Sequence, residues 1–187
     1  MDIPMLVLAG LWLILPSLLP NPAATIFGGG TPVDLGRSWK EKRILGDGKT
    51  WRGFIGGTCA GISLGIVQLY IAFPFDRLDY FGFGGFPENL GVIVVLAVGS
   101  MLGDMAGSFI KRRLDIGRGD KAPLLDQYGF LLCSFLLSLL FYPDWFLRNF
   151  WRGDGWISLL AVLIITPVLH RGVNIIGYKL GLKKVPW

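Results

Sequence analysis

Residues 90–110 read LGVIVVLAVGSMLGDMAGSFI and contain a single charged side chain, that of Asp104. Wound as an α-helix, this stretch is roughly 30 Å long, which matches the hydrocarbon thickness of a lipid bilayer. It shows none of the two-residue alternation of a barrel strand. The stretch therefore predicts a transmembrane helix that carries one acid within the membrane.

Four further apolar stretches of similar length flank this one along the chain. The five predicted spans are Pro4–Phe27, Phe54–Phe73, Leu90–Ile110, Leu124–Phe141 and Trp156–Val173. The 187 residues are 52% hydrophobic and only 17% charged, which is typical of a membrane protein and not of a soluble domain. We therefore predict an all-α, polytopic bundle of about five transmembrane helices, forming one domain over residues 1–187.

Prolines and the start of the chain affect the first predicted span. Pro16, Pro20 and Pro22 interrupt it, so a kinked or partly re-entrant segment is expected. The opening residues have Asp2 in place of a basic region and no small-residue cleavage pattern, so they are expected to remain as a helix and not to act as a signal peptide.

Lysine and arginine are distributed unevenly among the loops. The 28–53 loop holds six, the 111–123 segment five and the tail four, whereas the 74–89 loop holds one and the 143–155 loop two. Under the positive-inside rule this places the N-terminus outside and the C-terminus in the cytoplasm of a multi-pass protein of the cell membrane. Five spans fit this alternation.

Polar residues on the third span repeat at helical spacing. Asp104, Ser108, Lys111 and Asp115 lie at i, i+4, i+7 and i+11 and are expected to share one face of the helix. A charged carboxylate inside the membrane costs at least about 2.5 kcal/mol, so Asp104 should face protein or a wet cavity. A salt bridge between spans and a metal or phosphate site are both compatible with this face.

The segment after the third span adds a second acid at membrane depth. Pro123 suits the first turn of a helix, which puts Asp126 in the first turn of the fourth span. Two carboxylates that converge from adjacent helices repel each other unless a cation lies between them. Mg²⁺ is the natural candidate, bound by Asp104 and Asp126, with basic side chains nearby to hold phosphate charge, namely Lys111, Arg112, Arg118 and Lys121.

The first basic loop has the composition of a phosphate-binding loop. Gly48-Lys49-Thr50 precedes a predicted helix, but Arg43 stands where a Walker A motif needs its first glycine. Lys49, Thr50 and Arg52 can still bind phosphate through an ammonium, a hydroxyl, a guanidinium and backbone amides. The alternative is a basic loop beside the membrane that contacts anionic lipid.

Several other partners and sites are disfavoured or left open by the sequence. His170 is the only histidine and lies beside Arg171, so a zinc site or a histidine-dependent triad is not expected. The sequence contains no basic helix interleaved with aromatic residues, so nucleic-acid binding is not expected. Asp76 and Asp79 are expected to be solvated in an external loop. The sequence leaves open whether the chain acts alone or as a homo-oligomer.

These residues carry a family resemblance. Gly103-Asp104, Ser108, Lys111-Arg112 and then Lys121, Pro123 and Asp126 resemble the signature of membrane cytidylyltransferases that make CDP-diacylglycerol. The first loop, with residues 31–34 reading TPVD and residues 46–53 reading GDGKTWRG, is similar to that of the archaeal branch, the CDP-archaeol synthases. The bacterial signature has further residues after its proline, and of these only Asp126 is present; Gly129 stands at its second acidic position.

The resemblance implies a reaction and roles for the residues named above. CTP and an unsaturated archaeal ether-lipid phosphate, 2,3-bis-O-geranylgeranylglyceryl phosphate, would give CDP-archaeol and pyrophosphate with Mg²⁺. Asp104 and Asp126 would bind the metal. The remaining site residues would hold phosphate charge, namely Lys111, Arg112 and Lys121 near the α-phosphorus and pyrophosphate, and Lys49, Thr50, Arg52 and Ser108 around CTP or the lipid phosphate.

Two other functions remain as alternatives. An ion or solute transporter using Asp104 would need a polar path through both halves of the membrane, and the predicted external half is almost purely apolar. A phosphoalcohol transferase of phospholipid synthesis is marked by an aspartate-rich run that this sequence lacks.

Overall fold

The computed structural model describes residues 2–72, 80–117, 119–182 and 185–186 and is almost entirely helical. Some residues with a predicted place in a loop, in the tail or at the phosphate site lie outside the described residues, namely Asp76, Arg77, Asp79, Arg118, Lys183 and Lys184. The predicted end of the second span, Phe73, lies outside them as well. In chain order the helices and strands are α1 (Ile3–Leu13), α2 (Leu15–Leu18), α3 (Pro20–Phe27), β1 (Ser38–Trp39), β2 (Lys42–Arg43), α4 (Trp51–Ala72), α5 (Glu88–Arg113), α6 (Pro123–Phe141), α7 (Pro143–Phe150) and α8 (Gly155–Lys179).

Four helices are long and apolar enough to cross a membrane among the described residues: α4, α5, α6 and α8. The first predicted span is broken into α1, α2 and α3, with a bend of 44° between Ile3–Leu13 and Leu15–Phe27. The three prolines explain the break, since Pro16 and Pro20 each occupy the first turn of a new helix. Counted as one span, this segment makes five, which confirms the predicted all-α, multi-pass architecture.

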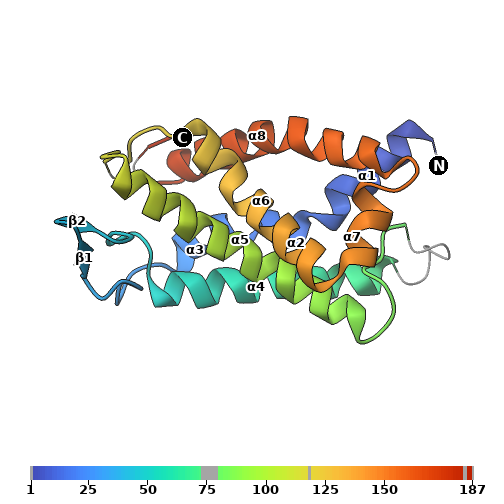
Figure 1. Ribbon diagram of the computed structural model, residues 1–187, viewed down its shortest axis with the longest axis horizontal. Helices are drawn as coiled ribbons and strands as arrows, with labels where there is room; N and C mark the ends of the chain where they lie inside the picture. The colour runs from blue at the N-terminus through green and yellow to red at the C-terminus, as the bar shows by residue number, and fades with distance from the viewer. Residues whose placement is uncertain (1, 73–79, 118, 183–184, 187) are drawn as a thin grey trace.

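The two ends of the bundle differ in what they carry (Figure 1). The N-terminus and α7 lie at one end, and the C-terminus and the β1–β2 hairpin lie at the other. Helices α4 and α8 run along opposite edges of the view, while α5 and α6 cross obliquely between them. The long basic loop between α3 and α4 therefore shares one end of the bundle with the end of α5 and the start of α6.

Two short elements were not predicted from the sequence. Residues expected to form a loop after the fourth span begin with α7, whose first turn holds Pro143 and which packs the buried Trp145 and Phe150 into the core. The first basic loop contains the two-residue antiparallel hairpin β1–β2, with Ser38 opposite Arg43. The hairpin is too short to show a period in the sequence, whereas the eight residues of α7 are strongly amphipathic and could have been recognised as a helix.

The predicted polar face of the third span is shorter than expected. Helix α5 ends at Arg113, and Asp115 follows it with a φ of 59°. Its side chain is 75% exposed and accepts a bond from Lys42 of the hairpin. Placing Asp115 on one face with Asp104 was therefore wrong, because the chain leaves the helix before reaching it.

Glycines allow the helices to pack at close range. Gly53, Gly57, Gly61 and Gly65 repeat every four residues along α4 and are all buried. A Cβ at Gly57 would lie 2.6 Å from the carbonyl oxygen of Pro20, and one at Gly61 would lie 2.6 Å from that of Pro16. The broken first span therefore rests directly on the backbone of α4, as small residues permit in membrane bundles.

Substitution of Gly61 tests this packing. Gly61→Ala should destabilise the purified protein by about 1–3 kcal/mol, because the new methyl group meets a backbone atom that cannot move aside. The measurement is the thermal unfolding midpoint in detergent. Gly172→Ala is the matched control, since Gly172 is also helical but has nothing within 4 Å of its Cβ position. Equal midpoints for the two variants would contradict the packing described here.

Candidate functional site

An ion pair joins the first basic loop to the acid on α5. The Lys49 ammonium lies 2.5 Å from Asp104 Oδ2, and the two side chains are 23% and 31% exposed. Lys49 lies two residues before the start of α4, and the loop places it beside the C-terminal half of α5, where Asp104 lies. The salt bridge that the sequence left as an alternative is thus present, and its basic partner comes from the loop and not from another span.

A second ion pair joins the end of α5 to the start of α6. The Lys111 ammonium lies 2.6 Å from Asp126 Oδ1, and these side chains are 16% and 27% exposed. The other oxygen of Asp126 accepts a bond of 3.3 Å from the backbone N–H of Ala122, just before the helix. Asp126 lies in the first turn behind Pro123, as predicted. There its carboxylate accepts a hydrogen bond from an N-terminal amide and interacts favourably with the positive end of the helix dipole.

The helices that carry the two acids are in backbone contact beside them. A Cβ at Gly103 would overlap the carbonyl oxygen of Gly129 and lie 2.7 Å from Phe130 Cα, and one at Gly107 would lie 3.5 Å from the Leu125 carbonyl oxygen. The structure therefore gives each carboxylate its own lysine on adjoining helices.

The chemistry of the two carboxylate donors is compatible with Mg²⁺. Among the described residues, no three Asp, Glu, His or Cys side chains gather as a metal-binding group. Two partly exposed carboxylates, those of Asp104 and Asp126, suit an ion that takes one or two carboxylates and completes its shell with water and substrate phosphates. Each carboxylate would exchange its lysine for the ion.

The other predicted site residues differ in their surroundings. Thr50 is buried, and its hydroxyl accepts a bond of 3.2 Å from the Gly53 N–H in the first turn of α4, so it caps that helix. Arg52 is exposed, and a Cβ at Gly30 would meet its stem at 3.1 Å. Ser108 is buried on α5. Arg112 has a buried Nε without a hydrogen-bond partner among the described residues, which leaves a donor for a bound anion.

A cavity of about 270 Å³ opens between the start of α6 and the end of α8. Lys121, Asp126 and Gln127 line one side, and His170 and Asn174 of α8 line the other. Lys49 and Asp104 are not among its lining residues. Sequence reasoning did not connect α8 with the site, although a histidine, an arginine and an asparagine at the end of an apolar span are a signal for it.

A larger cavity lies away from both ion pairs. It has a volume of about 460 Å³ and is lined at the α7 end of the bundle by Glu88, Asp144, Trp145, Arg148 and Arg152. We do not assign the site to this larger cavity, because none of the four residues of the two ion pairs lines it.

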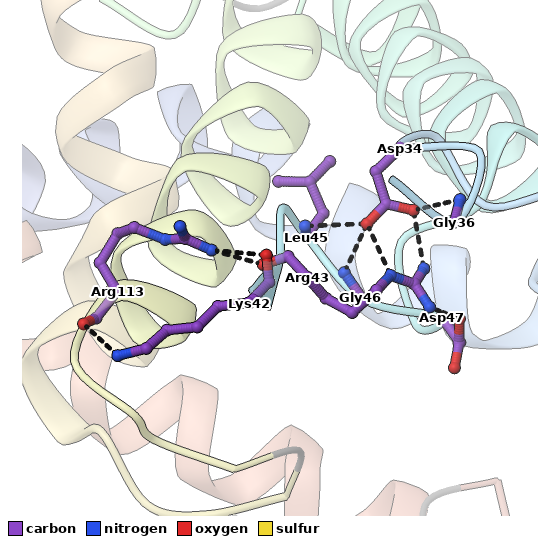
Figure 2. Close-up of polar contacts among 8 residues, drawn as sticks. All are labelled: Asp34, Gly36, Lys42, Arg43, Leu45, Gly46, Asp47 and Arg113. Carbon is purple, nitrogen blue, oxygen red and sulfur yellow. Dashed lines mark hydrogen bonds and ion pairs between the residues drawn. The ribbon is translucent and has the colours of Figure 1, made fainter. Parts of the chain in front are cut away.

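Asp34 organises the basic loop that carries Lys49 (Figure 2). Its carboxylate accepts bonds from the backbone N–H groups of Gly36, Leu45 and Gly46 and from the Arg43 guanidinium. Burial acts to raise the pKa of Asp34, but the bonds from Arg43 and the three amides outweigh it and hold the pKa well below its ordinary value. The carboxyl group therefore stays ionised at neutral pH.

Arg113 fixes the same loop to α5. Its guanidinium donates to the carbonyl oxygens of Trp39, Lys42 and Arg43 at 2.6–3.1 Å. It also lies 5.3 Å from the ring centroids of Trp39 and Phe109. The roles of Asp34 and Arg113 do not follow from the sequence, since their partners are set by the folded path of the loop.

Comparison with known proteins gives consistent matches over nearly the whole chain. Residues 3–187 match the family model described as CarS-like, CDP-archaeol synthase. The CDP-archaeol synthase of Methanospirillum hungatei is 50% identical over 175 residues, which are 93% of this chain and 100% of the relative. That of Archaeoglobus fulgidus is 45% identical over 183 residues, which are 97% of this chain and 98% of the relative.

A solved structure has the same fold. It is described as an intramembrane enzyme for archaeal membrane lipid biosynthesis, and it superposes with a TM-score of 0.65 at 32% sequence identity, covering 90% of this chain and 94% of its own. With matches of this extent and identity, the chain belongs to the CDP-archaeol synthase family.

Proposed function

We propose that this chain is a CTP-dependent cytidylyltransferase that condenses CTP with 2,3-bis-O-geranylgeranylglyceryl phosphate, giving CDP-archaeol and pyrophosphate. Family membership supports the activity. The observation that carries the choice of site is the pair of lysine–aspartate contacts, Lys49–Asp104 and Lys111–Asp126, on the helices and loop at the basic end of the bundle.

The reaction needs positioning and charge neutralisation more than proton transfer. An oxygen of the lipid phosphate forms a bond to the α-phosphorus of CTP, and the bond from that phosphorus to the oxygen bridging to the β-phosphate breaks. The nucleophile is already an anion, so no strong general base is required. Negative charge builds on the equatorial oxygens and on the departing pyrophosphate, where fixed cations lower the barrier.

The basic side chains have partners that substrate phosphates can replace. Lys49 and Lys111 each contact a carboxylate, and both are partly exposed. In the proposed complex they turn to phosphate oxygens, while Arg112, Arg52 and Lys121 add further positive charge. Ser108 and Thr50 supply hydroxyl groups, that of Thr50 while it caps α4. Mg²⁺ held by Asp104 and Asp126 would neutralise phosphate charge that these cations leave uncompensated.

The lipid substrate fits a site at the end of a membrane bundle. Isoprenoid chains can remain in the bilayer beside exposed apolar side chains of α6 and α8, such as Leu132, Leu136 and Ile164. The phosphate then meets the cavity between these helices, where Lys121 and Asp126 lie. Transport of an ion or solute is not favoured, since the family is named for synthesis of a lipid nucleotide.

Replacing the acid on α5 tests the site. Asp104→Asn should reduce CTP-dependent turnover by about 10²–10³-fold or more, because the amide carries no charge for the cations of the site. The assay follows formation of the CDP-lipid from labelled CTP and the lipid phosphate by purified protein. Asp144→Asn is the matched control, an exposed aspartate on α7 at the far end of the bundle. Normal turnover by Asp104→Asn would end the proposal for this site.

Metal removal tests the proposed role of Mg²⁺. Chelation with EDTA should abolish turnover, and added Mg²⁺ should restore it. Asp126→Asn should raise the Mg²⁺ concentration needed for half-maximal activity, because one of the two carboxylates is lost. Undiminished turnover after exhaustive chelation would contradict a metal requirement. An unchanged Mg²⁺ dependence in Asp126→Asn would contradict its role as a ligand.

The proposed orientation places the site in the cytoplasm of the cell, with the N-terminus outside. Trypsin added to inverted membrane vesicles should therefore cleave after Arg37 or Lys40, both exposed near β1. In right-side-out vesicles this loop should resist, whereas cleavage after the exposed Arg152 should appear. Mass spectrometry of the fragments identifies the cleavage sites in each vesicle preparation. Cleavage after Arg152 in inverted vesicles and after Arg37 or Lys40 in right-side-out vesicles would contradict the orientation.

A further inference from the structure

The loop that carries Lys49 into the site has little regular structure of its own. Between the end of α3 at Phe27 and the start of α4 at Trp51 it contains only the β1–β2 hairpin and an isolated bridge between Pro32 and Thr50. Such a segment loses much conformational entropy when it orders. Its shape must therefore be held by specific contacts.

Asp34 supplies those contacts within the loop. One oxygen of its carboxylate accepts from the N–H groups of Leu45 and Gly46, each at 2.9 Å, and from Arg43 Nε at 3.4 Å. The other oxygen accepts from the Gly36 N–H at 3.1 Å and from a terminal nitrogen of Arg43 at 2.8 Å. The side chain is 1% exposed. A carboxylate offers about four acceptor positions, so both oxygens are fully used and none remains for a metal ion.

Arg113 supplies the contacts between the loop and α5. Its guanidinium bonds to three carbonyl oxygens of the hairpin while lying against Trp39 and Phe109, whose rings stack with centroids 5.9 Å apart. Nine positions earlier on the same helix, Asp104 accepts the bond from Lys49. The loop is therefore attached to α5 at two places, at its hairpin through Arg113 and near its C-terminal end through Lys49.

We infer that Asp34 and Arg113 are positioning residues, which preform the 28–50 loop on α5 so that Lys49 and Thr50 meet the phosphate groups of the substrates. In the proposed mechanism both side chains bond to the loop and not to the substrates. This inference rests on the proposed function for its effect on catalysis, but the order of the loop can be measured without any turnover.

The inference predicts a particular kinetic signature. When a contact that orders the loop is lost, only a fraction of the molecules holds the binding-competent shape, and the apparent affinity falls by that fraction. Saturating substrate draws the loop back into place. Loss of Asp34 or Arg113 should therefore raise KM for CTP by roughly tenfold while kcat stays within about threefold.

The experiment uses full-length protein in lipid nanodiscs and the variants Asp34→Asn and Arg113→Lys. Hydrogen exchange of residues 33–50 should become faster in both variants, whereas exchange in α5 and α6 stays as in the unmodified protein. Arg113→Lys keeps the positive charge but loses the planar fork that reaches three carbonyl oxygens. If Asp34→Asn does not fold, the Arg113→Lys variant alone still tests whether these contacts order the loop.

Asp115→Asn is the matched control. Asp115 also receives a bond from the hairpin, through Lys42, but it is 75% exposed, and exposed ion pairs contribute little. Its KM and loop exchange should equal those of the unmodified protein.

Three results would overturn the inference. The first is unchanged hydrogen exchange of the loop in the variants, and the second is a fall in kcat at unchanged KM. The third is a KM and a loop exchange in Arg113→Lys equal to those of the unmodified protein, which would mean that Arg113 contributes only its positive charge. If the unmodified protein shows no CTP-dependent turnover, the proposed function fails, and the exchange measurement still decides whether these residues order the loop.

Discussion

An ionised carboxylate within an apolar helix must find a positive partner, and this requirement shapes the basic end of the bundle. Asp104 meets it through Lys49, which belongs to a loop and not to a membrane span. The loop must therefore fold back onto α5 and stay there. The hydrogen bonds of Asp34 within residues 28–50, and those of Arg113 to them, hold this loop in the shape that brings Lys49 to Asp104.

Close helix packing is what makes such a loop contact effective. On α5, Gly99 and Gly103 bring the backbone of α6 so near that a Cβ would lie 2.7 Å from Ser134 Cα or Phe130 Cα. On α4, glycines at every fourth position bring in the broken first span. Helix α5 is thus held between neighbours at fixed separation, and the side chains of Asp104 and Lys111 project from it at defined places.

The sequence was sufficient for the features that depend on local composition. Span length, the break at the prolines and the place of Asp126 behind Pro123 follow from hydropathy and helix-end preferences. The pairing of lysines with acids could not be assigned, because Lys49 and Asp104 are 55 positions apart and many basic side chains were available. Asp115 was misplaced because helical spacing was extended beyond the end of α5.

Asp34 shows why a motif residue can be seen in a sequence without its role being understood. It stands in the 31–34 segment that resembles the archaeal family, and the sequence alone assigned it no role. Its oxygens are already saturated by donors from residues 36, 43, 45 and 46. Those donors follow from the path of the loop, which depends in turn on Asp34, so the role becomes evident only in the folded chain. By contrast, Asp104 and Asp126 are each bonded to a single lysine side chain and remain partly exposed. We propose these two acids, and not Asp34, as the metal ligands, because the four donors around Asp34 hold the loop together internally.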